Sequence, residues 1–400
     1  MAPKPIIDIK HIRQNPELYE LTCLERNYPR QAENPARILQ LHSRWQELQR
    51  QGRSLRERSN LLRKFLANPA TSSGDEDVAD LRAMTREQVQ EEARRLKGEL
   101  SGIEQGEAAA VGEMEALALE MPNLTSDDTP RGHEPVVLSY INEQPRFDED
   151  ASEEAVWRSH LHIGSELGIL DFAGAAASSG WGWYYLLGEA AQLEQALVQY
   201  ALAVATRHGW TQVAPPSIVY SHIGAACGFQ PRDQNGEQQV YAIARSQADA
   251  DRGVPELCLA GTSEIPLAGM RANSTIDAED LPMRHVAVSR CYRAEAGARG
   301  ADTKGLYRVH EFTKVEMFAW TAPDEGEAQD VYEEMLDIQT EILSSLGLYC
   351  RVLSMPATDL GASASRKVDM EAYFPSRRQH GLGDGWGEVT SASIRIVASN

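Results

Sequence analysis

Two long runs of heptad-spaced apolar residues, separated by a short polar stretch, constrain the fold of this chain most. In residues 38–66 apolar or small residues recur at alternating spacings of three and four, and the pattern returns in residues 89–121. Such spacing is typical of helices that pack as a coiled coil. Asn68-Pro69 is expected to end the first helix, and residues 71–77 form a polar turn. The sequence predicts an antiparallel helical hairpin over about residues 37–121, an arm of about 45 Å at 1.5 Å per residue.

Basic residues are concentrated on the first of these helices. Residues 50–64 contain a single acid, Glu57, in a chain whose net charge is −20. The cations are Arg50, Arg53, Arg56, Arg58, Arg63 and Lys64. Such a cluster suits contacts with RNA phosphates, which position a nucleic acid without reading its sequence. A solvated helix face is the alternative interpretation.

Composition excludes several classes of protein. A length of 400 residues suggests two or three domains, and the acidic balance argues against a protein that coats nucleic acid generally. The five cysteines are scattered without Cys-x-x-Cys spacing, so we expect reduced thiols and no zinc site. No run approaches the ~18 apolar residues of a membrane span. Residues 1–8 are too short and too lightly charged for a signal or transit peptide.

Two extended segments around a glycine-rich loop carry the most unusual polar pattern. Residues 286–293 and 308–320 read as strands, and residues 298–305 as the loop between them. Period-2 alternation places one set of side chains on a single face of the second strand: Arg308, His310, Phe312, Lys314 and Glu316. The opposite face receives Val309, Thr313, Val315 and Met317. Because buried charge is costly unless it is paired, we expect something polar to lie against the charged face.

The chemistry of that face suits an elongated ligand. Phe312 and Glu316 lie four residues apart, which is about 13 Å at roughly 3.3 Å per residue. A ring can stack on a base, and a carboxylate can pair with an ammonium group. Arg293 and Glu295, at the end of the first strand, add a phosphate-binding fork and an acceptor. An ordinary hairpin with a solvated polar face is the alternative.

These residues resemble motif 2 of the class II aminoacyl-tRNA synthetases, in the version of the seryl-tRNA synthetases. The resemblance is carried by Arg293-Ala294-Glu295, Arg308-Val309-His310-Glu311-Phe312 and Val315-Glu316-Met317, and by Gly261-Thr262-Ser263-Glu264 upstream. It extends from about Ile6 to about Ile394. It implies an α+β fold in which residues 1–124 form a tRNA-binding helical arm. Residues 125–400 would form a class II catalytic core, an antiparallel sheet with flanking helices, in a homodimer.

The resemblance also implies a two-step reaction with ATP, L-serine and tRNA(Ser), and no membrane. Arg293 and Glu295 would be catalytic. The ATP-binding residues would be Arg293, Ala294, Glu295, Val309, Phe312, Glu388, Val389, Thr390 and Ser391. The serine-binding residues would be Thr262, Ser263, Glu264, Arg293 and Glu316. Glu388 and Ser391 would hold Mg²⁺, which prefers hard oxygen ligands. For Thr262-Ser263-Glu264 a helix N-cap is an equal alternative.

After Ile394 the resemblance ends. The family continues into motif 3, with an arginine for the γ-phosphate, whereas this sequence ends at Asn400. We therefore expect a core that lacks motif 3, leaves sheet edges unpaired, and binds tRNA better than it aminoacylates it. The alternative function is a non-catalytic tRNA-binding or interaction protein derived from a seryl-tRNA synthetase. A prolyl-type enzyme is a further alternative, against which the coiled-coil arm argues.

Several other elements are expected in the core. Glu189–His208 and Pro323–Leu346 read as amphipathic helices that end at glycine. Residues 150–167 read as a helix with Asp150 and Glu153 as a capping box, and residues 181–187 as a strand. Residues 209–217 resemble motif 1, the dimer-interface element of the class. Similarity to organellar enzymes of fungi suggests the mitochondrial matrix, although no presequence is visible; the cytoplasm is the alternative.

Overall fold

The computed structural model describes residues 7–67, 84–144, 158–229, 239–295, 305–379 and 384–395. Contacts within the chain divide it into a helical unit that ends at Leu124 and a second unit that begins at Thr125. Three predicted features lie outside the described residues: the polar turn at 71–77, the capping box of Asp150 and Glu153, and the loop at 298–304.

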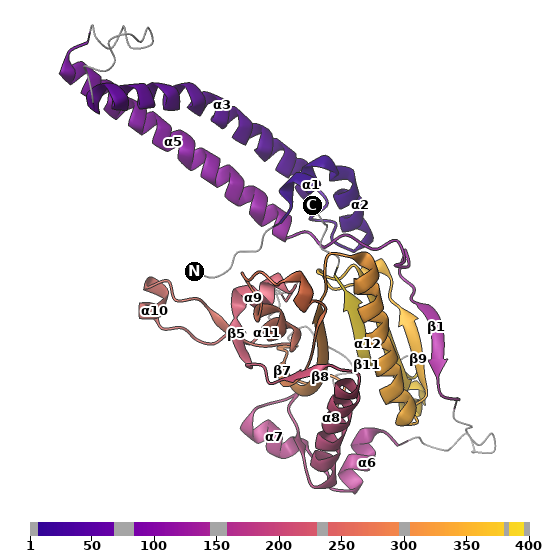
Figure 1. Ribbon diagram of the computed structural model, residues 1–400. Coiled ribbons are helices and arrows are strands. Elements are labelled where there is room, and N and C mark those ends of the chain that lie inside the picture. Colours follow the sequence, from indigo (N-terminus) through magenta and orange to yellow (C-terminus); the bar gives the residue numbers. More distant parts are fainter. Residues whose placement is uncertain are drawn as a thin grey trace. The chain divides into compact units, whose positions relative to one another are not determined.

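The described residues of the helical unit form four helices (Figure 1). They are α1 (Ile9–Gln14), α2 (Pro16–Glu25), α3 (Asn34–Ala67) and α5 (Arg86–Leu119). Pro16 starts α2, where its missing N–H is not needed. Thr85 and Gln88 cap α5 reciprocally, each side chain accepting a hydrogen bond from the other residue's backbone N–H at 3.3 and 2.8 Å.

The two long helices pack as the predicted antiparallel hairpin. Near one end, Ile38 of α3 packs with Met114 and Leu117 of α5; near the other, Leu62 packs with Val89 and Leu96. These contacts pair the start of one helix with the end of the other. The apolar heptad residues therefore form the seam between the helices, as the periodicity predicts.

A charged pair interrupts the middle of this seam. Gly52 lies on the seam, and a Cβ there would come within 2.7 Å of the Arg56 guanidinium. The missing side chain leaves room for Arg56 to reach across to α5. There it donates two hydrogen bonds to the Glu107 carboxylate, at 2.7 and 2.8 Å.

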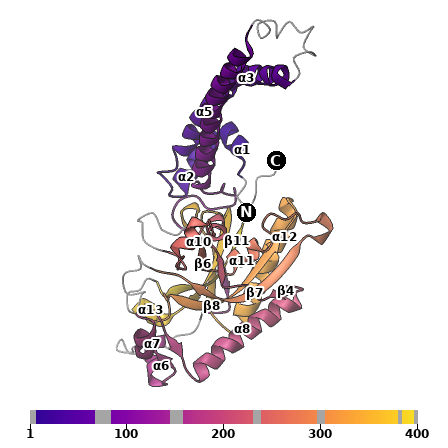
Figure 2. The same cartoon turned by 90° about the vertical axis from the view of Figure 1, so that its left-hand side faces the viewer.

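The second unit contains two main sheets, seen from two sides in Figures 1 and 2. The antiparallel sheet has the order β1 (Val136–Ile141), β9 (Cys350–Ser354), β10 (Arg366–Tyr373), β11 (Trp386–Ile394). The other has the order β4 (Thr211–Val213), β7 (Met283–Tyr292), β8 (Glu311–Trp320), with β4 and β7 parallel. Within the described residues, β8 pairs only with β7 and β11 only with β10.

Shorter elements connect these sheets. Two-stranded pairs are formed by β2 (Leu170–Asp171) with β3 (Tyr185–Leu186), and by β5 (Ile218–Tyr220) with β6 (Leu257–Leu259). The longer helices are α8 (Glu189–Arg207) and α12 (Glu325–Ser345). The remaining helices are α6 (His160–Glu166), α7 (Phe172–Ser178), α9 (Ser221–Ala226), α10 (Gln247–Asp251), α11 (Glu264–Gly269) and α13 (Pro375–Gln379). In the described part of the chain, 3₁₀ turns occur at Ala278–Asp280 and Ala357–Asp359.

Helix α12 packs against both main sheets. Its Tyr332 and Leu343 lie in one apolar cluster with Val352 and Met370 of the antiparallel sheet. Its Val331 and Ile338 lie in a second cluster with residues of α8 and with Val286 of β7. Because one helix covers one face of each sheet, the other face of each sheet points to the side away from α12.

The two strong helix predictions are confirmed, and two others need correction. Helices α8 and α12 end before Gly209 and Gly347, whose φ values are +84° and +68°. The predicted helix over 150–167 is wrong at Ser159, which is extended (ψ 166°) because it caps a shorter helix, α6. The predicted strand at 181–187 is reduced to β3, since Gly182 turns the backbone to a φ of +83°.

The cysteine and membrane expectations can be compared with the structure. All five cysteines are free and buried, in agreement with the expectation of reduced thiols. None of the described helices has the length and apolar character that a membrane-crossing segment needs.

Candidate functional site

The β7–β8 hairpin has one apolar and one polar face. Val315 and Met317 of β8 pack into the cluster that contains α8 and α12. In the register of the hairpin, Cys291 pairs with Phe312 and Ala287 with Glu316. Phe312, Lys314 and Glu316 therefore share the face that points away from the core, as the alternation predicts.

The predicted strand begins later than expected, at Glu311. His310 is not part of the β7–β8 ladder, because its N–H donates to the carbonyl of Gly182 at 3.1 Å. Its own carbonyl accepts from the N–H of Arg293 at 3.0 Å. The pairing between the two segments thus continues through Arg293 and His310, while a third segment holds His310 from the other side.

The backbone around Arg293 is fixed by several segments. The N–H of Tyr292 donates to Ala260 at 3.0 Å, and that of Ala294 donates to Gln239 at 3.1 Å. Glu295 follows in a left-handed conformation (φ +46°), which costs a non-glycine residue roughly 1 kcal/mol or more. Its carboxylate pairs with Arg308 at 3.5 Å. Strain of this kind persists only where the surrounding contacts hold it, and it is common at functional sites.

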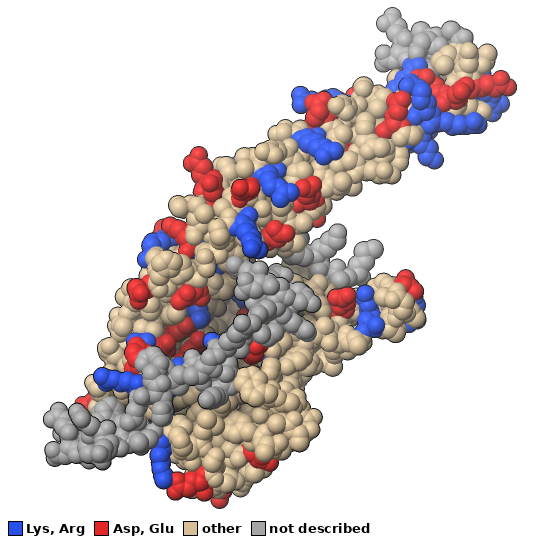
Figure 3. All heavy atoms as spheres, turned by 180° about the vertical axis from the view of Figure 1, so that it is seen from behind, with Lys and Arg blue, Asp and Glu red and all other residues tan. Residues whose placement is uncertain are grey.

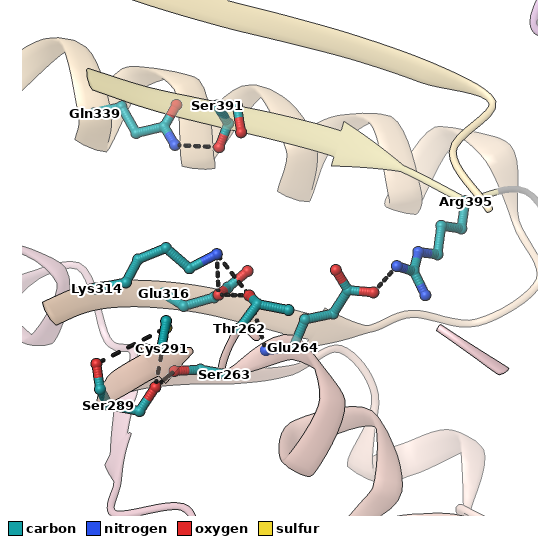
Figure 4. A network of polar contacts seen from close by, with 10 residues as sticks. All are labelled: Thr262, Ser263, Glu264, Ser289, Cys291, Lys314, Glu316, Gln339, Ser391 and Arg395. Carbon is teal, nitrogen blue, oxygen red and sulfur yellow. Dashed lines mark hydrogen bonds and ion pairs between the residues drawn. The ribbon is translucent and has the colours of Figure 1, made fainter. Parts of the chain in front are cut away.

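A partly buried polar network lies beside the hairpin, where α11 begins (Figure 4). The Thr262 hydroxyl donates to the Glu316 carboxylate at 2.5 Å and accepts from the Lys314 ammonium at 2.5 Å. Lys314 also pairs with Glu316 at 2.7 Å. Thr262 is 1% exposed, whereas the side chains of Lys314 and Glu316 are 32% and 18% exposed, so the ion pair is only partly shielded from water. The geometry fits recognition of a small ammonium-bearing molecule by Glu316.

Thr262-Ser263-Glu264 leads into helix α11, where an N-cap was the alternative interpretation. Ser263 occupies the N-cap position of α11 but makes no capping hydrogen bond with its side chain. Its hydroxyl instead contacts Ser289 of β7 at 2.6 Å, and Thr262 reaches β8. Glu264 pairs with Arg395, directly after β11. The Thr262 hydroxyl also accepts the N–H of Glu264, the first residue of α11, at 3.5 Å. The segment thus makes its short hydroxyl contacts to β7 and β8 and one long contact to the helix start.

Glu388 and Ser391 share one face of β11 because the strand contains a bulge. Met370 of β10 pairs with Thr390, and Glu371 pairs with Glu388, so Val389 has no partner. A spacing of three would place Glu388 and Ser391 on opposite faces of a regular strand. The extra residue restores them to the same face, the one that points away from α12.

This face fits a hard divalent cation. Glu388 is exposed and offers a carboxylate, and Ser391 a hydroxyl, which are oxygen ligands of the type that Mg²⁺ accepts. Burial raises the pKa of the neighbouring Asp369 to about 6; the Lys367 ammonium, 2.7 Å away, opposes this effect and the negative charge of Glu388 adds to it. A bound cation would add to the compensation that Lys367 supplies. No group of three His, Cys, Asp or Glu suited to metal binding occurs among the described residues, so further ligands would have to come from a bound substrate or water.

The cations of the arm differ in their surroundings. Arg56 and Arg58 are engaged across the hairpin, with Glu107 at 2.7 Å and Glu92 at 3.5 Å. Arg50 and Arg53 pair with acids of their own helix, Glu47 and Glu57, and are largely exposed. Within the described part of the chain, Arg63 and Lys64 have no recorded acidic partner, and both are exposed. Figure 3 shows basic and acidic side chains interspersed along the arm.

Sequence reasoning assigned no role to the aromatic residues around His310. Trp183 stacks on the His310 ring with 5.8 Å between centroids, and the Tyr241 hydroxyl lies 3.0 Å from its Nδ1. The aromatic-rich run at 181–187 was the one sequence feature that could have pointed to these contacts. It was interpreted as a strand, and its contact with His310 could not be predicted because the two segments lie far apart in the sequence.

Comparison with known proteins now identifies the family. The seryl-tRNA synthetase N-terminal domain model matches residues 6–125, and the tRNA synthetase class II core domain (G, H, P, S and T) model matches residues 243–392. The mitochondrial serine–tRNA ligase of Schizosaccharomyces pombe is 35% identical over 97% of this chain and 75% of its own length. The chain belongs to the seryl-tRNA synthetases. It is thus a member of an aminoacyl-tRNA ligase family with the class II synthetase fold.

Two further comparisons support this assignment. The mitochondrial serine–tRNA ligase of Saccharomyces cerevisiae is 43% identical over 68% of this chain, a match that spans only 56% of that relative's length. The solved structure of seryl-tRNA synthetase from Pyrococcus horikoshii complexed with ATP has a TM-score of 0.79 and 27% identity, covering 97% of this chain and 84% of that one. Both the helical arm and the core of this seryl-tRNA synthetase therefore have their counterparts in the family.

Proposed function

We propose that this seryl-tRNA synthetase activates L-serine with ATP and passes the seryl group to tRNA(Ser). In the first step a serine carboxylate oxygen attacks the α-phosphorus of ATP, forming seryl-adenylate and releasing pyrophosphate. In the second a terminal ribose hydroxyl of the tRNA attacks the acyl carbon and AMP leaves. The observation that carries the proposal is the polar face of the β7–β8 hairpin, which combines Arg293, Phe312 and Glu316.

For the ATP half of the site, Arg293 would bind the α-phosphate and stabilise the charge that develops there. Glu295 would contact the adenylate, and Phe312 would stack on adenine. Ala294 and Val309 would line the same space. The backbone contacts that fix residues 292–294 favour this assignment, because a preorganised phosphate-binding group loses little entropy on binding.

For the serine half, Glu316 would pair with the ammonium group, and Thr262 would hold Glu316 in place. Ser263 and Glu264 would complete the pocket, and Arg293 would reach the carboxylate end of serine. Lys314 already brings an ammonium group to within 2.7 Å of Glu316. This contact supports the proposal that the carboxylate can accept a cation of the size of the serine ammonium.

Glu388 and Ser391 would hold Mg²⁺, with Val389 and Thr390 beside the phosphates. When bound, the cation would neutralise negative charge on the phosphates of ATP. The β11 bulge would contribute to metal binding by aligning Glu388 and Ser391 on one face of the strand.

The arm would bind the tRNA through phosphate contacts. Arg63 and Lys64 are the best-placed cations for this role, since Arg56 and Arg58 are engaged with α5. Arg50 and Arg53 remain candidates, because ion pairs on an exposed helix face are weak. These contacts would position the tRNA without reading its bases.

We further propose that the chain forms a homodimer and acts in mitochondria. Apolar side chains of α8 and β5 are unusually exposed: Leu193 by 60%, Leu197 by 42%, Ile218 by 49% and Tyr220 by 48%. A second copy could cover such a surface. The two fungal relatives are both named as mitochondrial. Light scattering of the purified chain and organelle fractionation would test the two points separately.

Serine-dependent ATP–pyrophosphate exchange on the purified chain tests the reaction. Exchange that requires serine and is lost with alanine or threonine would support it. No exchange from folded protein, combined with retained binding of tRNA, would favour the alternative of a non-catalytic tRNA-binding protein.

A further inference from the structure

The imidazole of His310 lies against the backbone that carries Arg293. Its Nδ1 is 3.1 Å from the carbonyl oxygen of Arg293 and 3.0 Å from the hydroxyl of Tyr241. With the backbone bond from the N–H of Arg293 to the carbonyl of His310, the two residues are joined twice. Both polar groups of the Arg293 backbone therefore contact His310.

The ring itself is held by aromatic packing. Trp183 stacks on it at an interplanar angle of 25°, and Trp181 meets it edge-on with 6.3 Å between centroids. Gly182, between the two tryptophans, lies directly against the ring. A Cβ at Gly182 would come within 2.5 Å of its Cδ2 and 2.8 Å of its Nε2. The position of the ring is thus set by the 181–183 segment.

The neighbours of Nδ1 determine which tautomer fits. A carbonyl oxygen can only accept a hydrogen bond, so its contact with Nδ1 is favourable when Nδ1 carries the proton. The hydroxyl of Tyr241 can also accept. Both contacts are then satisfied by an Nδ1–H that points between the two oxygens, and Nε2 is left unprotonated beside Gly182.

We propose that His310 is a positioning residue for ATP binding: its Nδ1–H, held by the Trp181–Trp183 segment and Tyr241, fixes the backbone of Arg293. The inference rests on the proposed function, in which Arg293 binds the α-phosphate. Since Glu295 follows in a left-handed conformation, the chain needs such support at the point where Arg293 leaves β7. Among the described residues, His310 makes no hydrogen bond to Thr262, Lys314 or Glu316. Its effect on serine would pass only through the contact proposed between Arg293 and the serine carboxylate, and is smaller than its effect on ATP.

Two substitutions that differ in the place of one nitrogen test this role. In His310→Asn the amide nitrogen occupies the position of Nδ1 and can still donate to Arg293, whereas in His310→Gln it lies near the position of Nε2. We expect KM for ATP in the exchange reaction to stay within about threefold of wild type in His310→Asn. In His310→Gln it rises about tenfold, as expected for the loss of one hydrogen bond, and KM for serine rises less than KM for ATP. Equal effects of the two variants, or a change confined to serine, would overturn the proposal.

Two further measurements test the role of His310 independently of whether the chain catalyses ATP–pyrophosphate exchange. A non-hydrolysable seryl-sulfamoyl adenosine can be titrated calorimetrically into each variant, so the Asn and Gln variants can be compared even if the wild type shows no exchange. Long-range ¹H–¹⁵N spectra of the ligand-free chain report which ring nitrogen of His310 carries the proton, with His310→Asn assigning the signal. Protonated Nδ1 supports the proposal, and an Nε2–H tautomer contradicts it whatever the chain catalyses.

Discussion

The guanidinium of Arg293 lies over the ring of Phe312, with 5.2 Å between its central carbon and the ring centroid. Such a cation–π contact at an exposed position is worth about 0.5–1 kcal/mol. The proposed adenine and the guanidinium compete for the same ring, so ATP binding would have to move Arg293 off Phe312 or use the ring's other face. Either way, the proposed phosphate-binding group and the proposed stacking group are in contact in the ligand-free chain.

Replacing Phe312 should therefore weaken ATP binding specifically. We expect Phe312→Ala to raise KM for ATP by roughly tenfold or more, since stacking of a base on an aromatic ring contributes about 1–3 kcal/mol. Phe312→Trp should restore most of the affinity. Exchange kinetics over a range of ATP concentrations would check this, and an unchanged KM for ATP would show that adenine lies elsewhere.

Arg293 should tolerate no change, even to lysine. Arg293→Lys keeps the charge but loses the planar fork, and we expect kcat/KM for exchange to fall by about 10²-fold or more. Arg290 supplies a matched control on the same strand, because it points to the opposite face and pairs with Glu194 and Glu311. Arg290→Lys should leave exchange within a few-fold of wild type. Similar losses in both variants would indicate a general effect on the hairpin.

Glu316 should govern serine and not ATP. Glu316→Gln removes the charge that pairs with Lys314 and, as proposed, with the substrate ammonium. A hydrogen bond to a charged group contributes about 1.5–3 kcal/mol, so we expect KM for serine to rise by roughly 10- to 100-fold. Thr262→Ser, which keeps the hydroxyl, should have a much smaller effect. A rise in KM for ATP instead would contradict the assignment.

The arm offers a test that separates stability from RNA binding. Arg56 and Glu107 are joined across the seam and are 32% and 13% exposed, whereas the pair of Arg53 and Glu57 is far more exposed. We expect Arg56→Ala to destabilise the middle of the arm by about 1 kcal/mol, and Arg53→Ala by a few tenths. Hydrogen exchange of α3 and α5 in the full chain would measure both.

The exposed cations at the far end of α3 should behave in the opposite way. Substituting Arg63 and Lys64 with alanine should leave hydrogen exchange unchanged. It should weaken tRNA binding and reduce its dependence on salt concentration by about one counterion per residue. If the double variant binds tRNA like wild type at all salt concentrations, the arm contacts RNA through other residues.

Acid should loosen the segment around Leu306. The Nε2 of His160 accepts a hydrogen bond from the N–H of Leu306 at 2.9 Å, and burial lowers the pKa of His160 below its usual value of 6.5. Because the pKa of His160 is lower in the folded state than in the unfolded state, the unfolded state binds the proton more readily. The contribution of neutral His160 to the stability of the fold is therefore fully present above about pH 6.5 and is lost as the pH falls through the lowered pKa. We expect the melting temperature of wild type to fall more steeply between pH 7 and pH 5 than that of His160→Gln. Parallel curves would contradict the role of His160.

The parts of the fold that follow from local pattern could be predicted from the sequence. The heptads gave the α3–α5 hairpin, and the period of two gave the polar face of β8. The contacts of His310 could not be predicted, since Gly182 and Tyr241 lie in segments that only tertiary packing brings to it. Helix α6 was predicted too long because Ser159 acts as a cap, a role that depends on the extended backbone at that one residue. The proposed roles of the site residues came from the family resemblance and stay predictions.

The bulge at Val389 makes the pairing register of β11, and not only its side chains, decide which way Glu388 points. Any residue that tolerates an unpaired, exposed position should be accepted at 389. If Val389 paired with Glu371, as it would in a regular strand, Glu388 would turn onto the face that packs against α12. The side chain at position 389 is therefore free to vary, whereas its exclusion from the β10–β11 ladder keeps Glu388 and Ser391 on one face.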